Sequence, residues 1–487
     1  MEKINWNKRG MLTMLTDFYE LTMANGYLEN GLEDMIVYFD MFFRRVPDGG
    51  GFAIMAGLEQ LIEYIKSLRF TDEDIKFLKK KGIFSESFLQ YLKDFKFSCD
   101  VWAIPEGTPI FPNEPIVVVK GPIIEAQFIE SMILLTINHQ CLIATKANRI
   151  VRAAQGRPVL EFGTRRAQGY DGAVFGARAA YIGGCVGTAC TVADKDFGIP
   201  ASGTMAHSWV QLFPTELEAF RAYARVYPDN CTILVDTYNV LRSGIPNAIK
   251  VFQEEVVPRG FRPKGVRIDS GDIAYLSKKT RLMLDEAGFS DCKIVASNSL
   301  DEYIIGDILT QGAKIDVFGV GERLITSKTE PVFGGVYKLA GIEDNGNILP
   351  KMKISENVAK ITNPGFKRLF RLFDKNNNKA IADVITCDDE VINDSEAYEI
   401  FDPDHTWKRK VVTDFYAKQL LIKIFDKGKC VYNMPKLDDI REYARNQIET
   451  LWDEILRFEN PHRYYVDLSE KLWTIKDELL KSLTDVG

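Results

Sequence analysis

A repeated unit of a short apolar strand, a polar or glycine-rich turn and a helix runs through residues 136–340 and constrains the fold more than any other feature. Strands that alternate with helices at this spacing indicate parallel β/α units. About 200 residues of such units suit an irregular β/α barrel. A doubly wound open sheet is the alternative, because periodicity alone does not show closure. The expected strands are residues 158–162, 201–207, 232–235, 265–268, 293–296 and 315–318, and the expected helices are 173–182, 215–227, 244–256, 273–287 and 301–310.

The two flanks of this region have a different pattern. The N-terminal flank combines a helical pattern over residues 17–29 with proline-rich strand runs over 101–124, which are typical of an antiparallel module with exposed edges. The C-terminal flank shows a hairpin turn at 374–379 and a charged, helical tail at 438–483. We therefore expect an α/β chain with three domains. These are an N-terminal α+β, β-rich module (1–135), the irregular β/α barrel (136–345) and a C-terminal extension, first β and then helical (346–487).

Composition excludes several classes of function. The chain has 61 basic against 68 acidic residues, a net charge of −7, so its surface as a whole does not favour nucleic acid. An anionic substrate then requires a local basic pocket. No run approaches the roughly 18 apolar residues of a membrane helix, and residues 1–10 lack the apolar core of a signal peptide, so we expect a cytoplasmic protein without a membrane partner. The eight dispersed cysteines fit neither a zinc pattern nor a disulfide framework.

The polar residues that directly follow each expected strand are the candidates for chemistry. In a β/α barrel, catalytic groups project from the carboxyl ends of the strands. Six short segments occupy these positions and contain most of the distinctive polar residues of the region. They are EFGTRR (161–166), SGTMAHS (202–208), VDTYN (235–239), RIDSGD (267–272), SNSLDE (297–302) and FGVGERL (318–324).

Glycines in the last of these turns indicate a phosphate site. Gly319 and Gly321, with Gly312 upstream, allow backbone amides to approach a phosphate, and a helix that follows points its positive end at the anion. The final strands are also where β/α barrels often bind phosphate. The sequence therefore predicts phosphate binding at this end of the barrel.

Arginines and carboxylates are expected at the same mouth of the barrel. Arg165, Arg166 and Arg267 follow apolar strands, and guanidinium groups match phosphate and carboxylate in a bidentate manner. Structural salt bridges to nearby carboxylates are the alternative. Carboxylates beside these cations suit Mg²⁺ that is held chiefly by substrate phosphates, which indicates a substrate that carries diphosphate. These carboxylates are Asp236, Asp269 and Asp272.

His207 is one of only four histidines and lies in the polar segment 202–208. A single histidine after an apolar strand is more often a hydrogen-bonded core residue. Here Ser202, Thr204 and Ser208 surround it, and the strand end directs it towards the arginines. We therefore expect His207 to act as an acid, a base or a nucleophile.

Over residues 11–345 the chain resembles nicotinate phosphoribosyltransferase, the bacterial long form. The resemblance lies in Asp17-Phe18-Tyr19 with the helix that follows it, and then in EFGTRR, SGTMAHSWV, VDTYN, RIDSGD and FGVGERL in this order. The resemblance implies a type II phosphoribosyltransferase that joins nicotinate to 5-phosphoribosyl 1-diphosphate, as in NAD biosynthesis by salvage. It implies Mg²⁺, ATP as a co-substrate, which makes the enzyme formally a ligase, and a homodimer whose two active sites are shared between subunits.

The resemblance also implies roles for individual residues. Tyr19 is expected to come from the partner chain and to stack on the pyridine ring, with Phe162 on the other face. Arg267 is expected near nicotinate and diphosphate, and Arg165 on diphosphate. The ribose is expected beside Asp269, which is also the expected protein contact of Mg²⁺. Gly319 and Gly321 are the expected 5-phosphate site.

A transient phosphohistidine is implied as well. His207 matches the histidine that ATP phosphorylates in the family, and Asp236 matches the carboxylate that orients it. A phosphohistidine adds negative charge beside Mg²⁺ and diphosphate, which favours substrate binding and product release.

One position bears on the choice of substrate. The related nicotinamide enzyme carries an aspartate directly after the Gly187-Thr188 pair, where this chain has Ala189, and Thr188 is expected to bind substrate. A buried aspartate repels the carboxylate of nicotinate and alanine does not, so the acid is favoured. The alternatives are a nicotinamide- or quinolinate-specific phosphoribosyltransferase, and a non-catalytic nucleotide-binding scaffold.

Overall fold

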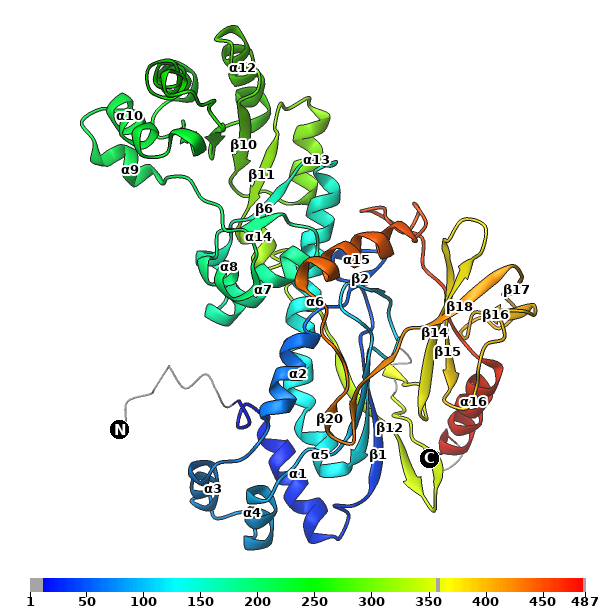
Figure 1. Ribbon diagram of the computed structural model, residues 1–487. Coiled ribbons are helices and arrows are strands. Elements are labelled where there is room, and N and C mark those ends of the chain that lie inside the picture. Colours follow the sequence, from blue (N-terminus) through cyan, green and yellow to red (C-terminus); the bar gives the residue numbers. More distant parts are fainter. Residues whose placement is uncertain (1–11, 356–359, 485–487) are drawn as a thin grey trace. The chain divides into compact units, whose positions relative to one another are not determined.

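The computed structural model describes residues 12–355 and 360–484 (Figure 1). The expectation that residues 1–10 lack a signal peptide lies outside the described residues. The chain forms two compact units, one made of Ile143–Pro331 and the other of Met1–Leu142 together with Val332–Gly487.

The unit Ile143–Pro331 is built on a six-stranded parallel sheet, as the alternating strand and helix pattern predicts. The strand order is β7-β6-β11-β10-β9-β8. The last strand, β11, pairs with the first, β6, which is the order of a ring. Within the described residues no ladder joins β7 to β8, so the ring of hydrogen bonds is open there. The strands are β6 (Val159–Glu161), β7 (Gly187–Thr188), β8 (Thr232–Leu234), β9 (Gly265–Ile268), β10 (Lys293–Ser297) and β11 (Val317–Val320).

The gap in this ring coincides with the one expected strand that is wrong. Residues 201–207 form no strand: Ala201 makes a single parallel bridge to Thr188, and a helix begins at His207. Apart from Met205, residues 201–206 are exposed or half-buried, whereas a central parallel strand needs apolar residues on both faces. The two-residue strand β7 has too few residues to produce a sequence pattern.

The helices of this unit lie close to the predicted ones, and side chains cap several of them. Thr215 accepts from the Glu218 amide, Asp272 from Tyr275, and Asp301 from Tyr303 and Ile304. The predicted helix 244–256 is α11 continued by a π-helical turn, Phe252–Val256. The helices are α7 (Tyr170–Ile182), α8 (Thr191–Phe197), α9 (His207–Leu212), α10 (Glu216–Val226), α11 (Ile245–Val251), α12 (Ile273–Glu286), α13 (Glu302–Thr310) and α14 (Glu322–Ile325).

The other unit contains a seven-stranded antiparallel sheet that joins the two ends of the chain. Its order is β13-β12-β1-β5-β3-β19-β20, so β1 pairs with β12 from the far side of the inserted unit. The antiparallel ladder predicted for residues 101–124 is confirmed by the pairing of β3 with β5. The strands are β1 (Ile36–Phe42), β3 (Asp100–Ala103), β5 (Val117–Pro122), β12 (Val336–Asp344), β13 (Asn347–Pro350), β19 (Ile422–Asp426) and β20 (Lys429–Cys430).

Helices from the N-terminal part cover this sheet. Helix α1 contacts α5, which packs on β1 and β5 (Figure 1). The predicted helix at 17–29 is confirmed. At the start of α3, Thr71 forms a capping box with Asp74. The helices are α1 (Phe18–Glu29), α2 (Leu58–Ser67), α3 (Asp72–Lys79), α4 (Glu86–Lys93), α5 (Ile123–Phe128) and α6 (Glu130–Ala153), and α6 continues into the other unit.

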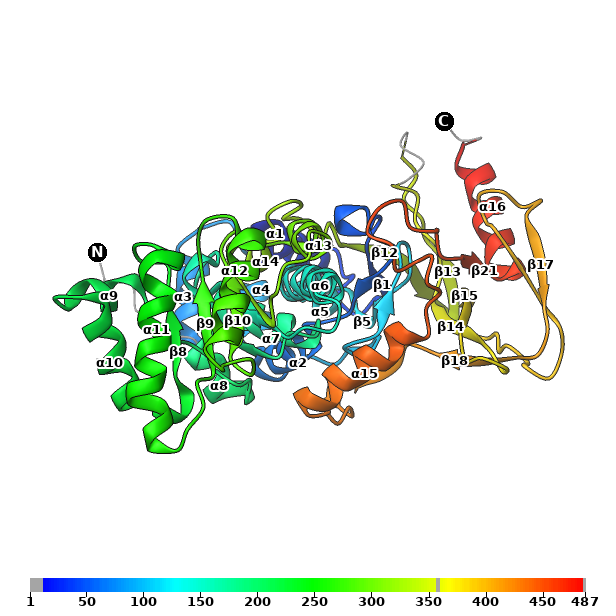
Figure 2. The same ribbon diagram turned by 90° about the horizontal axis from the view of Figure 1, so that it is seen from above.

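A four-stranded sheet of order β18-β14-β15-β21 makes up much of the C-terminal part. The predicted hairpin turn at 374–379 is confirmed, because it joins β14 to β15. Helix α16 packs on β15 (Figure 2). The predicted helical tail at 438–483 consists of two helices that are separated by β21. The elements are β14 (Lys367–Asp374), β15 (Ala380–Cys387), β16 (Tyr398–Phe401), β17 (Arg409–Val412), β18 (Phe415–Gln419), β21 (Val466–Leu468), α15 (Leu437–Glu449) and α16 (Glu470–Thr484), and β2 (Ala53–Ile54) pairs with β4 (Pro109–Ile110).

One helical stretch, Ile123–Ala153, has the length and hydropathy of a membrane span, and 72% of its apolar window is buried inside the protein. Seven of the eight cysteines are buried as free thiols, and Cys430 is half-buried. Burial raises the pKa of Cys231 and of Cys292 to about 12. These thiols therefore behave as small apolar core residues.

Candidate functional site

A cavity of about 410 Å³ lies at the carboxyl ends of the parallel strands. Five of the six polar segments predicted from sequence contribute to its wall, and the one at residues 235–239 does not. The parallel strands end at one edge, and this brings together residues that are far apart in the chain. The predicted site residues in the wall are Phe162, Arg165, His207, Arg267, Asp269, Gly319 and Gly321, and Arg166 and Ala189 also line it.

Arg267 is held at the centre of a hydrogen-bond network. Its Nε donates to the Ser297 hydroxyl (2.9 Å), and its Nη2 donates to Asp269 Oδ1 (3.2 Å). Its Nη1 reaches the Thr204 hydroxyl at 3.4 Å. The guanidinium carbon also lies 5.7 Å from the centre of the Phe162 ring. Arg267 is thus a fixed cation beside an aromatic face, which suits an anionic aromatic ligand.

Two glycines at the end of the last strand, β11, lie against Phe162. A Cβ atom at Gly319 would lie 2.5 Å from Phe162 Cδ2, and one at Gly321 would lie 3.0 Å from the Phe162 carbonyl oxygen. Close approach, and not a positive φ, therefore requires glycine here. Helix α14, which follows, has only four residues and therefore a small dipole. An anion bound at this turn would be held by backbone amides more than by the helix dipole. Gly312 lies elsewhere: with φ of +80° it ends the turn after α13, so its assignment to the phosphate turn is wrong.

The three aspartates have different roles. Asp269 lines the cavity. Asp236 is buried, and its Oδ2 accepts from the Asp269 amide (3.0 Å) and the Ser270 hydroxyl (2.6 Å). Its Oδ1 is buried and has no hydrogen-bond partner among the residues that the structure describes. Asp272 caps α12. Asp269 is therefore the aspartate that faces the cavity, and Asp236 holds the backbone from which Asp269 projects.

The two ring nitrogens of His207 face different neighbours. Its Nδ1 lies 3.1 Å from the Thr237 hydroxyl oxygen, and its Nε2 lies 3.9 Å from Asp269 Oδ2. Asp236, the carboxylate that the resemblance assigns to orient His207, directs its Oδ2 to the Asp269 amide and the Ser270 hydroxyl. The hydroxyl at Nδ1 belongs to Thr237, the residue that follows Asp236.

Thr188 lies beneath the cavity wall. It is fully buried, and its hydroxyl donates to Glu161 Oε2 (2.6 Å) and accepts from the Cys190 amide (2.9 Å). Glu161 is itself buried and also accepts from the Gly163 amide. Burial raises the pKa of Glu161, and these two donors oppose that shift. Thr188 and Glu161 thus brace the turn that carries Ala189, whose amide donates to the Glu161 carbonyl (2.8 Å).

Tyr19 lies in α1, in the unit that does not contain the cavity. It is 44% exposed, and burial of its hydroxyl together with Glu130 raises its pKa. Arg165 and Arg166 are exposed in the short turn Thr164–Arg166 at the cavity wall. In the described part of the chain, no three His, Cys, Asp or Glu side chains gather as metal ligands. A cation here would need ligands from a substrate.

Several residues of the site were not assigned a role from the sequence. Ser297, Thr204 and Thr237 are the hydroxyls that hold Arg267 and His207. Their position directly after a strand was the available signal, but hydroxyl residues are too common there to be selected. Asn298 and Ser299 also line the cavity, with φ of 96° and 46°. Backbone strain of this kind in non-glycine residues is concentrated at functional sites.

A parallel sheet with helices between its strands, and with arginines, a carboxylate and close-packed glycines at its carboxyl edge, defines an α/β protein whose ligand cavity lies at the strand ends. The comparisons with known proteins then define the family. Residues 158–387 match the nicotinate phosphoribosyltransferase (NAPRTase) family, residues 14–138 its N-terminal domain and residues 366–476 its C-terminal domain. The chain belongs to the nicotinate phosphoribosyltransferase family, which is a family of enzymes.

Full-length relatives agree with this assignment. Nicotinate phosphoribosyltransferase of Bacillus subtilis is 45% identical over 469 residues, which cover 96% of this chain and 95% of the relative. The Mycobacterium tuberculosis enzyme pncB2 is 38% identical over 94% of this chain and 92% of its own length. The crystal structure of human nicotinic acid phosphoribosyltransferase superimposes with a TM-score of 0.85 and 29% identity, and covers 95% of this chain and 99% of that one. The family predicted from the motifs is confirmed.

Proposed function

We propose that the chain transfers the phosphoribosyl group of 5-phosphoribosyl 1-diphosphate to nicotinate, which gives nicotinate mononucleotide and diphosphate and begins NAD salvage from nicotinate. The observation that carries this proposal is the gathering of Arg267, Asp269 and Gly319 around one cavity beside the uncharged Ala189. The names of the relatives support it.

The transfer itself follows from these groups. The ring nitrogen of nicotinate attacks C1 of the ribose, and the C1–oxygen bond breaks, so diphosphate leaves with the electron pair. Arg165 and Arg267 stabilise the charge that develops on the diphosphate. Phe162 supports one face of the pyridine ring, and Gly319 with Gly321 leaves space for the 5-phosphate. The pyridine nitrogen carries its own lone pair, so no general base is required.

ATP phosphorylates His207 in this proposal. When the Nδ1–H of His207 donates to the Thr237 hydroxyl, the lone pair of the ring lies on Nε2. Nε2 faces Asp269, which lines the cavity. Nε2 attacks the γ-phosphorus of ATP, the bond to the β–γ bridging oxygen breaks, and ADP leaves. Water later breaks the phosphorus–nitrogen bond and releases phosphate.

Mg²⁺ is the proposed metal, bound chiefly by diphosphate. The Oδ1 atom of Asp269 accepts from Arg267 and Ser297, whereas Oδ2 faces His207. One carboxylate oxygen with substrate phosphates and water is the usual ligand set of Mg²⁺. When bound, the metal would neutralise charge on the leaving diphosphate.

Asp236 acts in this proposal as a positioning residue. It fixes the amide of Asp269 and the hydroxyl of Ser270, and thereby the carboxylate that faces His207. Its effect on the phosphohistidine is therefore indirect. Thr188 acts in a similar way, through Glu161 and the turn that carries Ala189.

A homodimer with shared sites is the proposed assembly, with Tyr19 of the partner subunit stacking on nicotinate. The exposure of Tyr19 and its neighbour Phe18 (44% and 48%) leaves both rings available to a second copy. Mixing Tyr19→Ala and His207→Ala subunits tests this. Shared sites restore part of the activity in the mixture, and unshared sites restore none.

The remaining expectations are part of the same proposal. The ring order of the six strands, with β11 beside β6, supports an irregular β/α barrel over an open doubly wound sheet. The burial of most of the stretch Ile123–Ala153 favours a cytoplasmic location over a membrane span. Thr188, assigned to the substrate by resemblance, is proposed to act from behind the wall.

A steady-state assay with phosphoribosyl diphosphate, Mg²⁺ and either nicotinate or nicotinamide, with and without ATP, tests the function. We expect mononucleotide from nicotinate only, with stimulation by ATP. Product from nicotinamide contradicts the role of Ala189. No product from either substrate favours the quinolinate enzyme or a binding scaffold, and a further assay with quinolinate distinguishes these two.

A further inference from the structure

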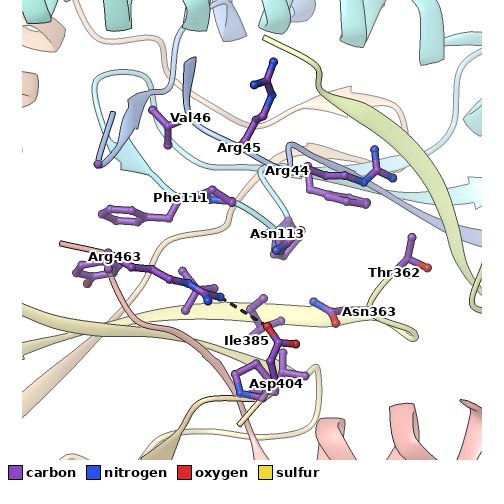
Figure 3. Close-up of a pocket in the computed structure, with 18 of the residues that line it drawn as sticks. Arg44, Arg45, Val46, Phe111, Asn113, Thr362, Asn363, Ile385, Asp404 and Arg463 are labelled. Carbon is purple, nitrogen blue, oxygen red and sulfur yellow. Dashed lines mark ion pairs between the residues drawn. The ribbon is translucent and has the colours of Figure 1, made fainter. Parts of the chain in front are cut away.

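A second cavity, of about 910 Å³, lies within the unit formed by Met1–Leu142 and Val332–Gly487 (Figure 3). It shares no lining residue with the cavity at the strand ends. Its wall combines the end of β1 and the glycine turn after it, the loop after β4, and the C-terminal chain around β21 and α16. The transfer reaction described above uses none of these residues.

The wall of this second cavity is basic. Among the residues that the structure describes, five basic side chains line it against two carboxylates, in a chain whose net charge is −7. In Figure 3 the side chains of Arg463 and Asn363 point towards the same space. A local excess of positive charge in a concave site attracts anions. The basic residues are Arg44, Arg45, Lys367, Arg463 and Lys476, and the carboxylates are Asp40 and Asp404.

Contacts within the wall offset some of these charges. Lys367 pairs with Asp40 (Nζ to Oδ2, 2.7 Å), and both side chains are buried. Arg463 lies 3.7 Å from Asp404, and both side chains are well exposed, so that pair contributes little.

Lys476 has a neutral partner instead. Its Nζ donates to Asn363 Oδ1 at 2.9 Å. Burial lowers the pKa of Lys476 and nearby Lys367 lowers it further, whereas Asp404 opposes the shift. An anion beside Lys476 would therefore remove an unfavourable electrostatic environment, and Asn363 and Arg463 are positioned to contact the same ligand.

The size and the apolar part of the wall indicate more than an inorganic ion. A volume of about 910 Å³ is in the range of organic ligand sites, which are typically ~300 to 1,000 Å³. Val46, Phe111 and Ile385 form an apolar side, and Phe111 is fixed by stacking on Tyr464 at 3.8 Å between ring centres. We propose that this cavity binds a nucleoside phosphate, with its phosphate at Lys476, Asn363 and Arg463 and its base on the apolar side.

Photolabelling of the full-length chain with 8-azido-ATP, followed by peptide mass spectrometry, tests the proposal. This inference does not depend on the proposed reaction, because the two cavities lie on separate peptides. We expect label on peptides that cover residues 40–51, 361–367 or 460–476. Label confined to peptides from residues 158–331 overturns the proposal.

Competitors distinguish a nucleoside phosphate from a simple anion. We expect unlabelled ATP to displace the probe from the C-terminal peptides at lower concentration than either inorganic phosphate or adenosine. Displacement by inorganic phosphate as efficient as that by ATP would overturn the assignment of a base subsite. Displacement by adenosine as efficient as that by ATP would overturn the phosphate subsite.

Charge-removing variants locate the phosphate. We expect Lys476→Met to weaken labelling of these peptides about tenfold, the usual effect of losing a charged hydrogen bond. The matched control is Lys481→Met, on the same helix and outside the cavity wall, which should leave labelling unchanged. If Lys476→Met does not fold, as judged by its melting curve, Arg463→Gln replaces it, because that side chain is 73% exposed and supports no core. Unchanged labelling in the folded variant contradicts the proposal.

Discussion

The Nδ1 atom of His207 lies 3.1 Å from the hydroxyl oxygen of Thr237, and the opposite ring nitrogen faces Asp269 at 3.9 Å. A neutral hydroxyl therefore holds one nitrogen of the ring, and the other nitrogen is directed to the side of the cavity where phosphates are proposed to bind. A carboxylate at Nδ1 would have held the same tautomer with a stronger hydrogen bond. Thr237 is thus the residue whose removal tests how the histidine is oriented.

Thr237→Val keeps the shape of this side chain and removes the hydroxyl. We expect ATP-dependent labelling of His207 and the stimulation by ATP to fall about three- to tenfold, the effect of one neutral hydrogen bond. The rate without ATP should stay the same, because the transfer step does not use Thr237. Thr237→Ser is the control and should retain the stimulation. An equal loss of both rates would show a general structural effect instead.

Ala189→Asp introduces a carboxylate into the cavity wall, where Ala189 is exposed. We expect kcat/KM for nicotinate to fall at least about tenfold, because two like charges that face each other across the cavity repel. The ratio of nicotinamide to nicotinate turnover should rise. Ala189→Asn has nearly the same size without the charge and should keep most of the nicotinate activity. Equal losses in both variants would indicate crowding of the site.

Gly319→Ala places a methyl group where Phe162 now lies, 2.5 Å from its Cδ2 atom. The ring must move, and with it the support of Arg267. We expect kcat/KM to fall about a hundredfold, as for a displacement of about 1 Å at a reacting centre. Gly306→Ala in α13 is the matched control, because nothing lies within 4 Å of its new methyl group. Full activity in Gly319→Ala would show that the ring does not position the substrate.

Asp467→Asn tests a buried carboxyl in β21. Burial, reinforced by Asp402, raises the pKa of Asp467 to about 7. Between about pH 4 and pH 7 the folded chain keeps this proton and the unfolded chain releases it, so the free energy of unfolding falls as pH rises through that range. At pH 8 we expect the variant to have a higher Tm than the parent, because its free energy of unfolding is larger by at most ~4 kcal/mol. At pH 4 the two Tm values should be nearly the same.

Thermal melts at the two pH values check this prediction. The control is Asp453→Asn, which replaces an exposed aspartate in a turn. Its effect on Tm should be small and similar at both pH values. A shift for Asp467→Asn that does not depend on pH would mean that its carboxyl is ionised in the folded chain.

Secondary structure was predictable where the side-chain pattern is strong. Five of the six expected parallel strands are present, because each is a short apolar run between turn signals. The sixth, at 201–207, is absent because its residues do not supply the apolar faces that a central strand buries. The membership of Arg267, Asp269, His207 and Gly319 in one site was also predictable, because parallel strands end at the same edge.

The sequence alone thus determined the element types, the residues at the strand ends and the family. Tertiary structure decided which groups meet: Thr237 contacts His207, Asp236 holds Asp269, and β1 pairs with β12 across an inserted unit. The physical reason is that a sequence pattern reports local burial and turn geometry. A hydrogen bond between distant residues depends on strand register and on side-chain rotamers, which are set only when the packed core brings the segments together.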